Sequence, residues 1–385
     1  MSRLPEPFFE TPAITPEQFL AELPRWILLD VRSPAEFGEG HLPGAWNCPV
    51  LEDLERHQVG LKYKQEGQQA AIDLGVELVW SAREGRANEW LRRALSGVTG
   101  ERRILVSCWR GGLRSLLAAS WVAEVLKNNP DRYGQVSVSR LAGGYKAVRG
   151  KLLEAISAPR DMVVLSGMTG SGKTALLHDL IALSGFDSRR VIDLERLARH
   201  RGSSFGHAVS EAGERIEQPS QQFFENQLGL QVLQGASGPL VVEDESTLIG
   251  KISIPLEFRR QMRAAPVVVV ETPIDLRARA IFREYVSQPL EQGCEVESLW
   301  QVLAENISAL ERRLGGQDTR EALLALASGK ACPREFAAQD PWIRTLLEKY
   351  YDRAYAQSGR LAERNVIFRG DLVACRNFLK DYGGE

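Results

Sequence analysis

The chain alternates short, continuous apolar runs with longer stretches in which apolar residues recur at helical spacing. Continuous apolar runs are typical of strands buried on both faces, and their alternation with helices predicts a parallel sheet covered by helices. In the first part of the chain, the amphipathic stretch 113–126 is predicted to be a helix. The strands predicted there are 26–30, 45–50, 104–107 and, with a weaker pattern, 136–141.

The same alternation starts again after Ala158-Pro159-Arg160, which breaks a helical stretch that begins at Tyr145. The strands predicted in this second part are 162–166, 191–194, 240–242 and 267–271. From Leu299 onward the chain is mostly helix-forming, with a last short strand at 365–369. We therefore predict an α/β domain over 1–157, a second α/β domain over 158–298, and a mostly helical region over 299–385 that packs on the second domain.

Composition narrows the class of protein. The 385 residues are 44% hydrophobic and 25% charged, which is ordinary globular usage and excludes a disordered chain. A formal net charge of -2 excludes a uniformly basic nucleic-acid binder, although it allows a local basic groove. The start lacks the form of a secretory signal, and no apolar run reaches about 18 residues, so a cytoplasmic protein without a membrane partner is expected. The five cysteines are scattered without a CxxC pair, which argues against a disulfide framework or a zinc cluster.

One cysteine lies where a buried strand runs into a glycine-bearing loop and then a helix. Cys108 directly follows the strand 104–107, and the loop continues with Arg110, Gly111, Gly112 and Arg114. A strand, a short loop and a helix in this order point several backbone N–H groups at one spot. Those amides and the two arginines would stabilise a thiolate, whereas the simpler interpretation is a core cysteine before an ordinary turn.

A second loop carries a phosphate-binding pattern. Residues 167–174 read GMTGSGKT, which matches GxxxxGK[ST] in full between a predicted strand and a predicted helix over 175–183. Successive N–H groups would surround a diphosphate, Lys173 would reach its terminal oxygens, and Thr174 is a candidate Mg²⁺ ligand. The phosphate-binding residues predicted from this motif are Gly167, Gly170, Ser171, Gly172, Lys173 and Thr174.

Acidic and basic residues follow two further predicted strands of the second domain. Glu243, Asp244 and Glu245 come after 240–242 and could orient a metal ion; the alternative is a solvated acidic turn. The segment 193–206 follows the strand 191–194, and its arginine, serine and glycine content suits an anion or RNA backbone at the same sheet edge. The candidate contacts to RNA or phosphate in that segment are Arg199, Arg201, Ser203 and Ser204.

Several motifs carry a resemblance to known families. Residues 29–37, 40–45 and 108–114 resemble the motifs of a rhodanese domain, in the order that family uses. A rhodanese-like half joined to a P-loop half resembles the bacterial tRNA 2-selenouridine synthases, and four more specific stretches support this. They are 143–149, 200–206, 242–246 and 350–355.

The resemblance implies a transferase that acts on the wobble uridine of certain tRNAs. In that family 2-thiouridine is S-geranylated by geranyl diphosphate and then converted to 2-selenouridine with selenophosphate. The resemblance implies Cys108 as the catalytic residue that carries selenium or activates selenophosphate. It also implies that the loop of Arg110, Gly111, Gly112 and Arg114 binds the anionic selenium or sulfur donor. It implies no tightly bound cofactor apart from the candidate Mg²⁺, and it leaves Asp30, Arg32, Glu36 and His41 as residues that brace the fold.

Alternatives stay open at several positions. Cys48 could resolve a disulfide with Cys108, although a packing role is favoured. Arginine clusters around 189–201, 259–263 and 277–283 could contact tRNA or form solvated helix faces, and nearby tyrosines could stack on a base or pack in a core. As a whole, the chain could instead be a generic sulfurtransferase fused to a kinase-like ATPase, or a non-catalytic phosphate-binding module.

Overall fold

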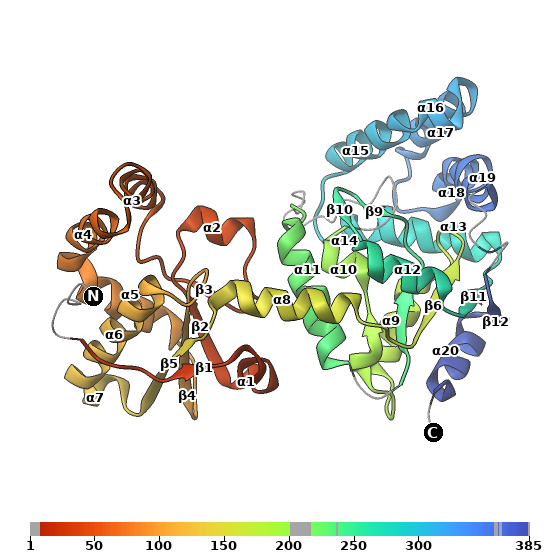
Figure 1. Ribbon diagram of the computed structural model, residues 1–385. Helices are drawn as coiled ribbons and strands as arrows, with labels where there is room; N and C mark the ends of the chain where they lie inside the picture. The colour runs from red at the N-terminus through yellow and green to blue at the C-terminus, as the bar shows by residue number, and fades with distance from the viewer. Residues whose placement is uncertain (1–7, 201–216, 236–237, 358–360, 362–363, 384–385) are drawn as a thin grey trace. The chain divides into compact units, whose positions relative to one another are not determined.

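The computed structural model describes residues 8–200, 217–235, 238–357, 361 and 364–383 (Figure 1). The chain forms two compact units, one of residues 1–155 with 220–229, the other of 156–219 with 230–385. The sequence did not indicate that 220–229, the first turns of one long helix, belong to the first unit. Within the described residues, no helix is long and apolar enough to span a bilayer.

The first unit contains a sheet of five parallel strands in the order β1-β5-β4-β2-β3. Its strands are β1 (Ala13–Ile14), β2 (Trp26–Asp30), β3 (Trp46–Asn47), β4 (Arg102–Ser107) and β5 (Val136–Leu141). Asp30 pairs in register with both Ser107 and Asn47, so the residues that follow β2, β3 and β4 meet at one edge. This parallel α/β architecture confirms the predicted fold class.

Helices cover both faces of this sheet, and the core lies between them and the apolar strands. Trp90 and Trp121 stack at 6.3 Å between ring centroids within this core. The helices are α1 (Pro16–Ala21), α2 (Pro34–Glu39), α3 (Asp53–Glu66), α4 (Gln68–Val79), α5 (Arg83–Ala94), α6 (Leu113–Asn128), α7 (Pro130–Tyr133) and α8 (Gly144–Ser157), with short 3-10 turns η1 (Leu23–Arg25) and η2 (Trp80–Ala82).

The second unit contains another five-stranded parallel sheet, in the order β12-β11-β6-β8-β7. Its strands are β6 (Met162–Gly167), β7 (Val191–Ile192), β8 (Leu240–Glu243), β11 (Val267–Val270) and β12 (Val366–Gly370). A separate antiparallel pair joins β9 (Leu248–Ile249) and β10 (Ile252–Ser253). Leu165 pairs with Glu243 and Gly167 with Val270, so the residues that follow β6, β8 and β11 share an edge.

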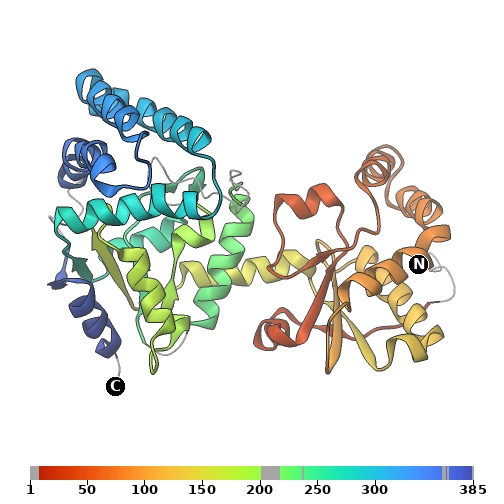
Figure 2. The ribbon, with the colours of Figure 1, turned by 180° about the vertical axis from the view of Figure 1, so that it is seen from behind.

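Apolar residues of two helices pack on the face of this sheet that Val163 and Leu165 form (Figure 2). These helices are α9 (Lys173–Ala182) and α20 (Leu372–Asp381). The other elements next to the sheet are η3 (Ser188–Arg190), α10 (Leu194–Ala198), α11 (Gln221–Gln234) and α12 (Leu256–Ala264).

The stretch between β11 and β12 is a helical layer with its own apolar core around Trp300 and Trp342. Its elements are α13 (Ile274–Phe282), η4 (Arg283–Ser287), α14 (Gln288–Glu291), α15 (Val296–Ala309), α16 (Glu311–Leu314), α17 (Gly316–Gly329), α18 (Phe336–Leu346), η5 (Leu347–Tyr351) and α19 (Asp352–Gln357). Both η4 and η5 are π-helical turns, a rare conformation that is frequent at functional sites.

Candidate active sites

The thiol of Cys108 lies at the start of the loop that joins β4 to α6. Its side chain is buried, and its Sγ donates a hydrogen bond to Ser115 Oγ at 3.3 Å. The Ser115 hydroxyl in turn donates to the carbonyl of Gly112 at 2.9 Å. Ser115 belongs to the first turn of α6, and the sequence analysis assigned it no role. Its position seven residues after the cysteine was the signal that could have indicated the contact.

The start of α8 supports this loop through a close approach of two backbones. Tyr145 N donates to Cys108 O at 2.8 Å, and Lys146 N donates to Trp109 O at 3.0 Å. Gly144 has a φ of 61°, and a Cβ there would lie 2.2 Å from Cys108 O and 2.4 Å from Gly111 N. Only glycine fits at such a contact, because any side chain would push the loop away. The motif at residues 143–149 therefore has a structural task at the thiol.

Charged side chains surround the loop unequally. Arg110 is exposed, whereas Arg114 is half-buried and bonds Glu36 at 2.5 Å and 3.2 Å. Burial, the largest single effect, would raise the pKa of Glu36. The hydrogen bonds and charge of Arg114, the Ser33 amide and the charge of Arg56 together outweigh burial and hold that pKa below its usual range. The charge that Arg114 offers to an anion is therefore partly compensated, while Arg110 stands open to solvent.

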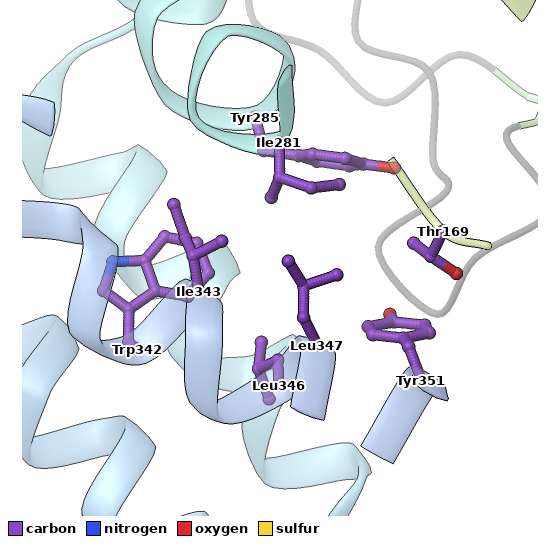
Figure 3. Close-up of a pocket in the computed structure, with 8 residues that line it drawn as sticks. All are labelled: Thr169, Ile281, Tyr285, Trp342, Ile343, Leu346, Leu347 and Tyr351. Atoms are coloured by element: carbon purple, nitrogen blue, oxygen red, sulfur yellow. The ribbon is translucent and has the colours of Figure 1, made fainter. Parts of the chain in front are cut away.

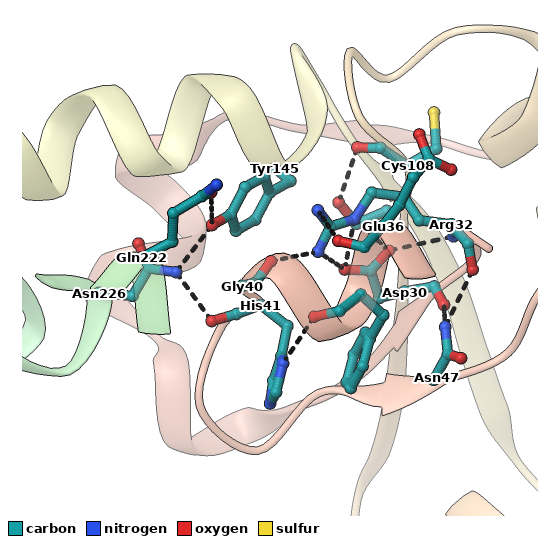
Figure 4. Close-up of polar contacts among 12 residues, drawn as sticks. Asp30, Arg32, Glu36, Gly40, His41, Asn47, Cys108, Tyr145, Gln222 and Asn226 are labelled. Carbon is teal, nitrogen blue, oxygen red and sulfur yellow. Dashed lines mark hydrogen bonds and ion pairs between the residues drawn. The ribbon is translucent and has the colours of Figure 1, made fainter. Parts of the chain in front are cut away.

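A buried polar network borders the loop (Figure 4). Arg32 forms an ion pair with Asp30 at 2.7 Å, donates to the Gly40 carbonyl at 2.8 Å, and lies 4.0 Å from the centre of the Tyr145 ring. From α11, Asn226 donates to the Tyr145 hydroxyl at 2.9 Å and to a backbone carbonyl at 2.8 Å. These contacts give Asp30 and Arg32 the bracing role that the sequence analysis assigned to them.

Cys48 and His41 are held by packing. Burial raises the pKa of the Cys48 thiol to about 12, so it stays protonated and weakly nucleophilic near neutral pH. All five cysteines are free thiols. The His41 ring stacks on Phe37 at 3.8 Å between centroids and bonds the Phe37 carbonyl through Nδ1 at 3.0 Å. Neither side chain is arranged for chemistry.

The P-loop between β6 and α9 has the conformation that a phosphate cradle requires. Gly170 and Gly172 have φ values of 77° and 90°, which side chains rarely adopt. Lys173 Nζ donates to the Gly167 carbonyl at 2.9 Å, across the loop. Ser171 is buried, and no described residue offers its hydroxyl a hydrogen-bond partner. The loop thus holds a lysine and a free hydroxyl where phosphate oxygens would lie.

Three carboxylates gather beside the P-loop threonine. Oxygens of Glu195, Glu243 and Glu245 all lie within 4.8 Å of one another, and Thr174 Oγ1 donates to Glu195 Oε2 at 3.3 Å. Glu243 is fully buried, and its Oε2 has no hydrogen-bond partner among the described residues. Burial raises the pKa of Glu243 well above its usual range, and the neighbouring carboxylates add to the shift. A buried oxygen without a donor, beside other oxygen ligands, fits a hard divalent cation such as Mg²⁺.

Of the three acids predicted at the end of strand β8, Glu243 and Glu245 belong to the acidic group, whereas Asp244 has other partners. Asp244 accepts a hydrogen bond from Ser166 Oγ at 2.6 Å and forms an ion pair with Arg364 at 3.3 Å. The structure instead adds Glu195 to the acidic group. The sequence analysis placed Glu195 at the same sheet edge without a metal role.

All six predicted phosphate-binding residues line one open cavity of about 910 Å³. Glu195, Asp244 and Glu245 lie on its wall, and the helical layer supplies exposed arginines and partly buried tyrosines. Those from the helical layer are Arg279, Arg283, Arg313, Tyr285, Tyr350, Tyr351 and Tyr355.

The remaining predicted contacts differ in their placement. Arg277, from one of the basic clusters, is buried: it donates to Thr169 O at 2.8 Å and pairs with Asp352 at 2.5 Å, so it is no solvated or RNA-facing residue. Arg199 is exposed at the end of α10 with a φ of 48°. Arg201, Ser203 and Ser204 lie outside the described residues.

The two sites and their folds define a class of protein in which a rhodanese-like domain with a loop cysteine is joined to a P-loop domain. Family models agree with this division. Residues 15–151 match the rhodanese-like domain, and residues 160–384 match the tRNA 2-selenouridine synthase AAA domain.

Relatives cover nearly the whole chain. It is 39% identical to the tRNA 2-selenouridine synthase of Hahella chejuensis, over 91% of this chain and 90% of that one. It is 38% identical to the synthases of Shewanella loihica (92% and 93% covered) and Cupriavidus necator (93% and 95%). The chain belongs to the tRNA 2-selenouridine synthase family, which confirms the resemblance drawn from the motifs.

Proposed function

We propose that this chain is a tRNA-modifying transferase that replaces the sulfur of wobble 2-thiouridine by selenium, through an S-geranyl intermediate. Geranyl diphosphate and selenophosphate are the two donors. Membership of the family supports the selenation of tRNA. The two chemically different sites support a division of the reaction into two steps.

The P-loop cavity suits the first step. The amides of the loop and Lys173 would bind the diphosphate of the prenyl donor, and Thr174, Glu195, Glu243 and Glu245 would hold Mg²⁺. When bound, Mg²⁺ would neutralise charge on the diphosphate. The thiocarbonyl sulfur attacks C1 of the geranyl group, the C1–O bond breaks, and the diphosphate leaves with the electron pair. The base loses its N3 proton to solvent. Preorganised amides and a lysine stabilise such a leaving group without reorganisation.

The Cys108 loop suits the second step. Selenium in selenophosphate is already fully reduced, so exchange at C2 of the base needs no external oxidant or reductant. Selenium forms a bond to C2, the C2–S bond breaks, and geranylthiol leaves with the electron pair and a proton. Hydrolysis of the Se–P bond then releases phosphate. Exposed Arg110, the loop amides and Arg114 would bind the anionic donor, and Cys108 would activate it.

One observation supports the proposal most: the chain has both a P-loop beside a group of carboxylates and a separate loop thiol, and each is held in place by its own neighbouring residues. The test uses a thiolated anticodon stem-loop incubated with enzyme, geranyl diphosphate, Mg²⁺ and selenophosphate, with nucleosides analysed by mass spectrometry. Cys108→Ser should retain geranylation and lose selenation. Lys173→Ala should lose geranylation, and with it selenation of the thiolated RNA. The same variant should still selenate RNA that is supplied already geranylated. Cys332→Ser and Lys380→Ala are the matched controls, because both side chains are exposed.

Three results would contradict the proposal. RNA that stays chemically unchanged with the wild-type enzyme would overturn it entirely. If both variants lost only selenation, the assignment of the cradle to the prenyl donor would be wrong. Rapid ATP hydrolysis without tRNA, abolished by Lys173→Ala, would favour a sulfurtransferase fused to an ATPase.

A further inference from the structure

An apolar nook lies beside the P-loop cavity, between α13 and α18. Its volume is about 20 Å³, which is room for roughly one water-sized group. Thr169, Ile281, Tyr285 and Tyr351 line both the nook and the larger cavity, so the two spaces adjoin each other. The nook is completed by Trp342, Ile343, Leu346 and Leu347.

Two helical segments face each other across this space (Figure 3). Ile281 and Tyr285 project from one segment toward Ile343 and Leu347 on the other, with Thr169 of the P-loop at one end and Trp342 at the opposite end. Trp342 is buried, and its Nε1 donates to Gln339 Oε1 at 3.0 Å, which fixes the ring. Trp342 is therefore a fixed wall at the end of the nook that lies away from Thr169.

The surroundings of the nook indicate a ligand with one charged and one apolar end. At one end it is lined by Thr169 of the P-loop, whose lysine and amides would bind phosphate oxygens. Tyr285 and Tyr351 reach it from the two π-helical turns η4 and η5, so both irregular turns border the same ligand space. An apolar chain attached to a diphosphate would satisfy both ends of this arrangement at once.

We infer that the nook receives the far end of the prenyl chain and limits its length, with Ile281 as the residue that sets the limit. This inference rests on the proposed function. The nook has room for about one methyl-sized group at the end of the chain. A chain longer by one isoprene unit would therefore clash with Trp342. Ile281 is half-buried and lines both the nook and the larger cavity, so a larger side chain there would close the nook and a smaller one would enlarge it.

The experiment measures binding of inorganic diphosphate and of dimethylallyl, geranyl and farnesyl diphosphates by calorimetry in the presence of Mg²⁺. The wild type should bind geranyl diphosphate at least about tenfold more tightly than inorganic diphosphate, and farnesyl diphosphate more weakly. Ile281→Trp should lose about tenfold in affinity for geranyl diphosphate but bind inorganic and dimethylallyl diphosphates as before. Ile281→Ala should raise the affinity for farnesyl relative to geranyl diphosphate. Leu324→Trp, on an exposed position of α17, is the control.

The outcomes distinguish a failure of this inference from a failure of the proposed function. If the wild type prefers geranyl diphosphate but neither Ile281 variant changes the preference for chain length, the nook is not the site of the chain end and only this inference falls. If the wild type binds geranyl diphosphate no better than inorganic diphosphate, the prenyl donor itself is wrong, and the inference falls with it. Unchanged binding of inorganic diphosphate by Ile281→Trp shows that the variant is folded.

Discussion

Replacing Gly144 by alanine should disable the Cys108 loop without touching the thiol. The new Cβ would lie 2.2 Å from Cys108 O, 2.4 Å from Gly111 N and 2.9 Å from Arg110 N. All three atoms are backbone, so no flexible side chain can yield to the methyl group. Moreover, the φ of Gly144 is 61°, which an alanine adopts only with strain.

The magnitude follows from these contacts. The left-handed conformation costs a non-glycine residue about 1–2 kcal/mol. Removing the clash requires the loop and the start of α8 to separate by about 1 Å, and a misplacement of that size can reduce a rate by about 100-fold. We therefore expect the free energy of unfolding to fall by about 2–4 kcal/mol and selenation to slow by about two orders of magnitude.

The assay uses a stem-loop that is already geranylated, supplied with selenophosphate under single-turnover conditions. Geranylation of a thiolated stem-loop by the same variant is the internal reference, and it should stay within about twofold of wild type because the P-loop belongs to the other unit. Gly150→Ala is the matched control: Gly150 lies in the same helix, and a Cβ there meets nothing within 4 Å. Selenation by Gly144→Ala at the wild-type rate would refute the assignment of the reaction to this loop.

Three further substitutions test separate parts of the two sites. Arg277→Lys keeps the charge but cannot bond Thr169 O and Asp352 at the same time. Inorganic diphosphate should therefore bind about tenfold more weakly, as measured by calorimetry. Unchanged affinity would show that the P-loop does not depend on these two contacts. Ser115→Ala removes the hydrogen-bond partner of the Cys108 thiol and should slow selenation by about tenfold with geranylation intact, whereas equal rates would exclude a positioning role. Cys48→Ala should leave both rates unchanged, because burial raises the pKa of this thiol to about 12. Because the side chain is buried, the same change should lower the free energy of unfolding by about 1 kcal/mol in a urea titration. Loss of selenation would instead indicate that Cys48 is a disulfide partner of Cys108.

The strands were predictable wherever apolar residues run without interruption. Strands β2 and β5 occupy the predicted ranges, and β6 and β8 each extend one residue further. Strand β4 begins two residues earlier than predicted, because Arg102 and Arg103 pair with Val136 and Ser137 of β5. Strand β1 was missed, since its two residues carry no periodic signal.

The sites were predictable only where their residues are contiguous. The P-loop and the Cys108 loop are local motifs whose spacing fixes their geometry. The partners that complete them come from distant segments: Gly144 lies 36 positions beyond Cys108, and Glu195 lies 21 beyond Thr174. No local pattern separates Glu243, which faces the acidic group, from its neighbour Asp244, which faces Ser166. Successive strand residues point to opposite faces, and only the sheet shows which face meets the P-loop.

In the second unit, the local P-loop motif and the distant helical layer contribute different parts of the cavity. The P-loop recognises phosphate, which many ligands carry, so its strong motif says little about what is attached to that phosphate. Another part of the cavity wall comes from α13, η4, η5 and α19, whose sequence predicts only helices. Arg277 joins the two parts, since one guanidinium bonds the P-loop carbonyl of Thr169 and the carboxylate of Asp352. We therefore expect the helical layer to select the organic part of the proposed donor, so that substitutions there change which diphosphate is used before they change whether a diphosphate binds.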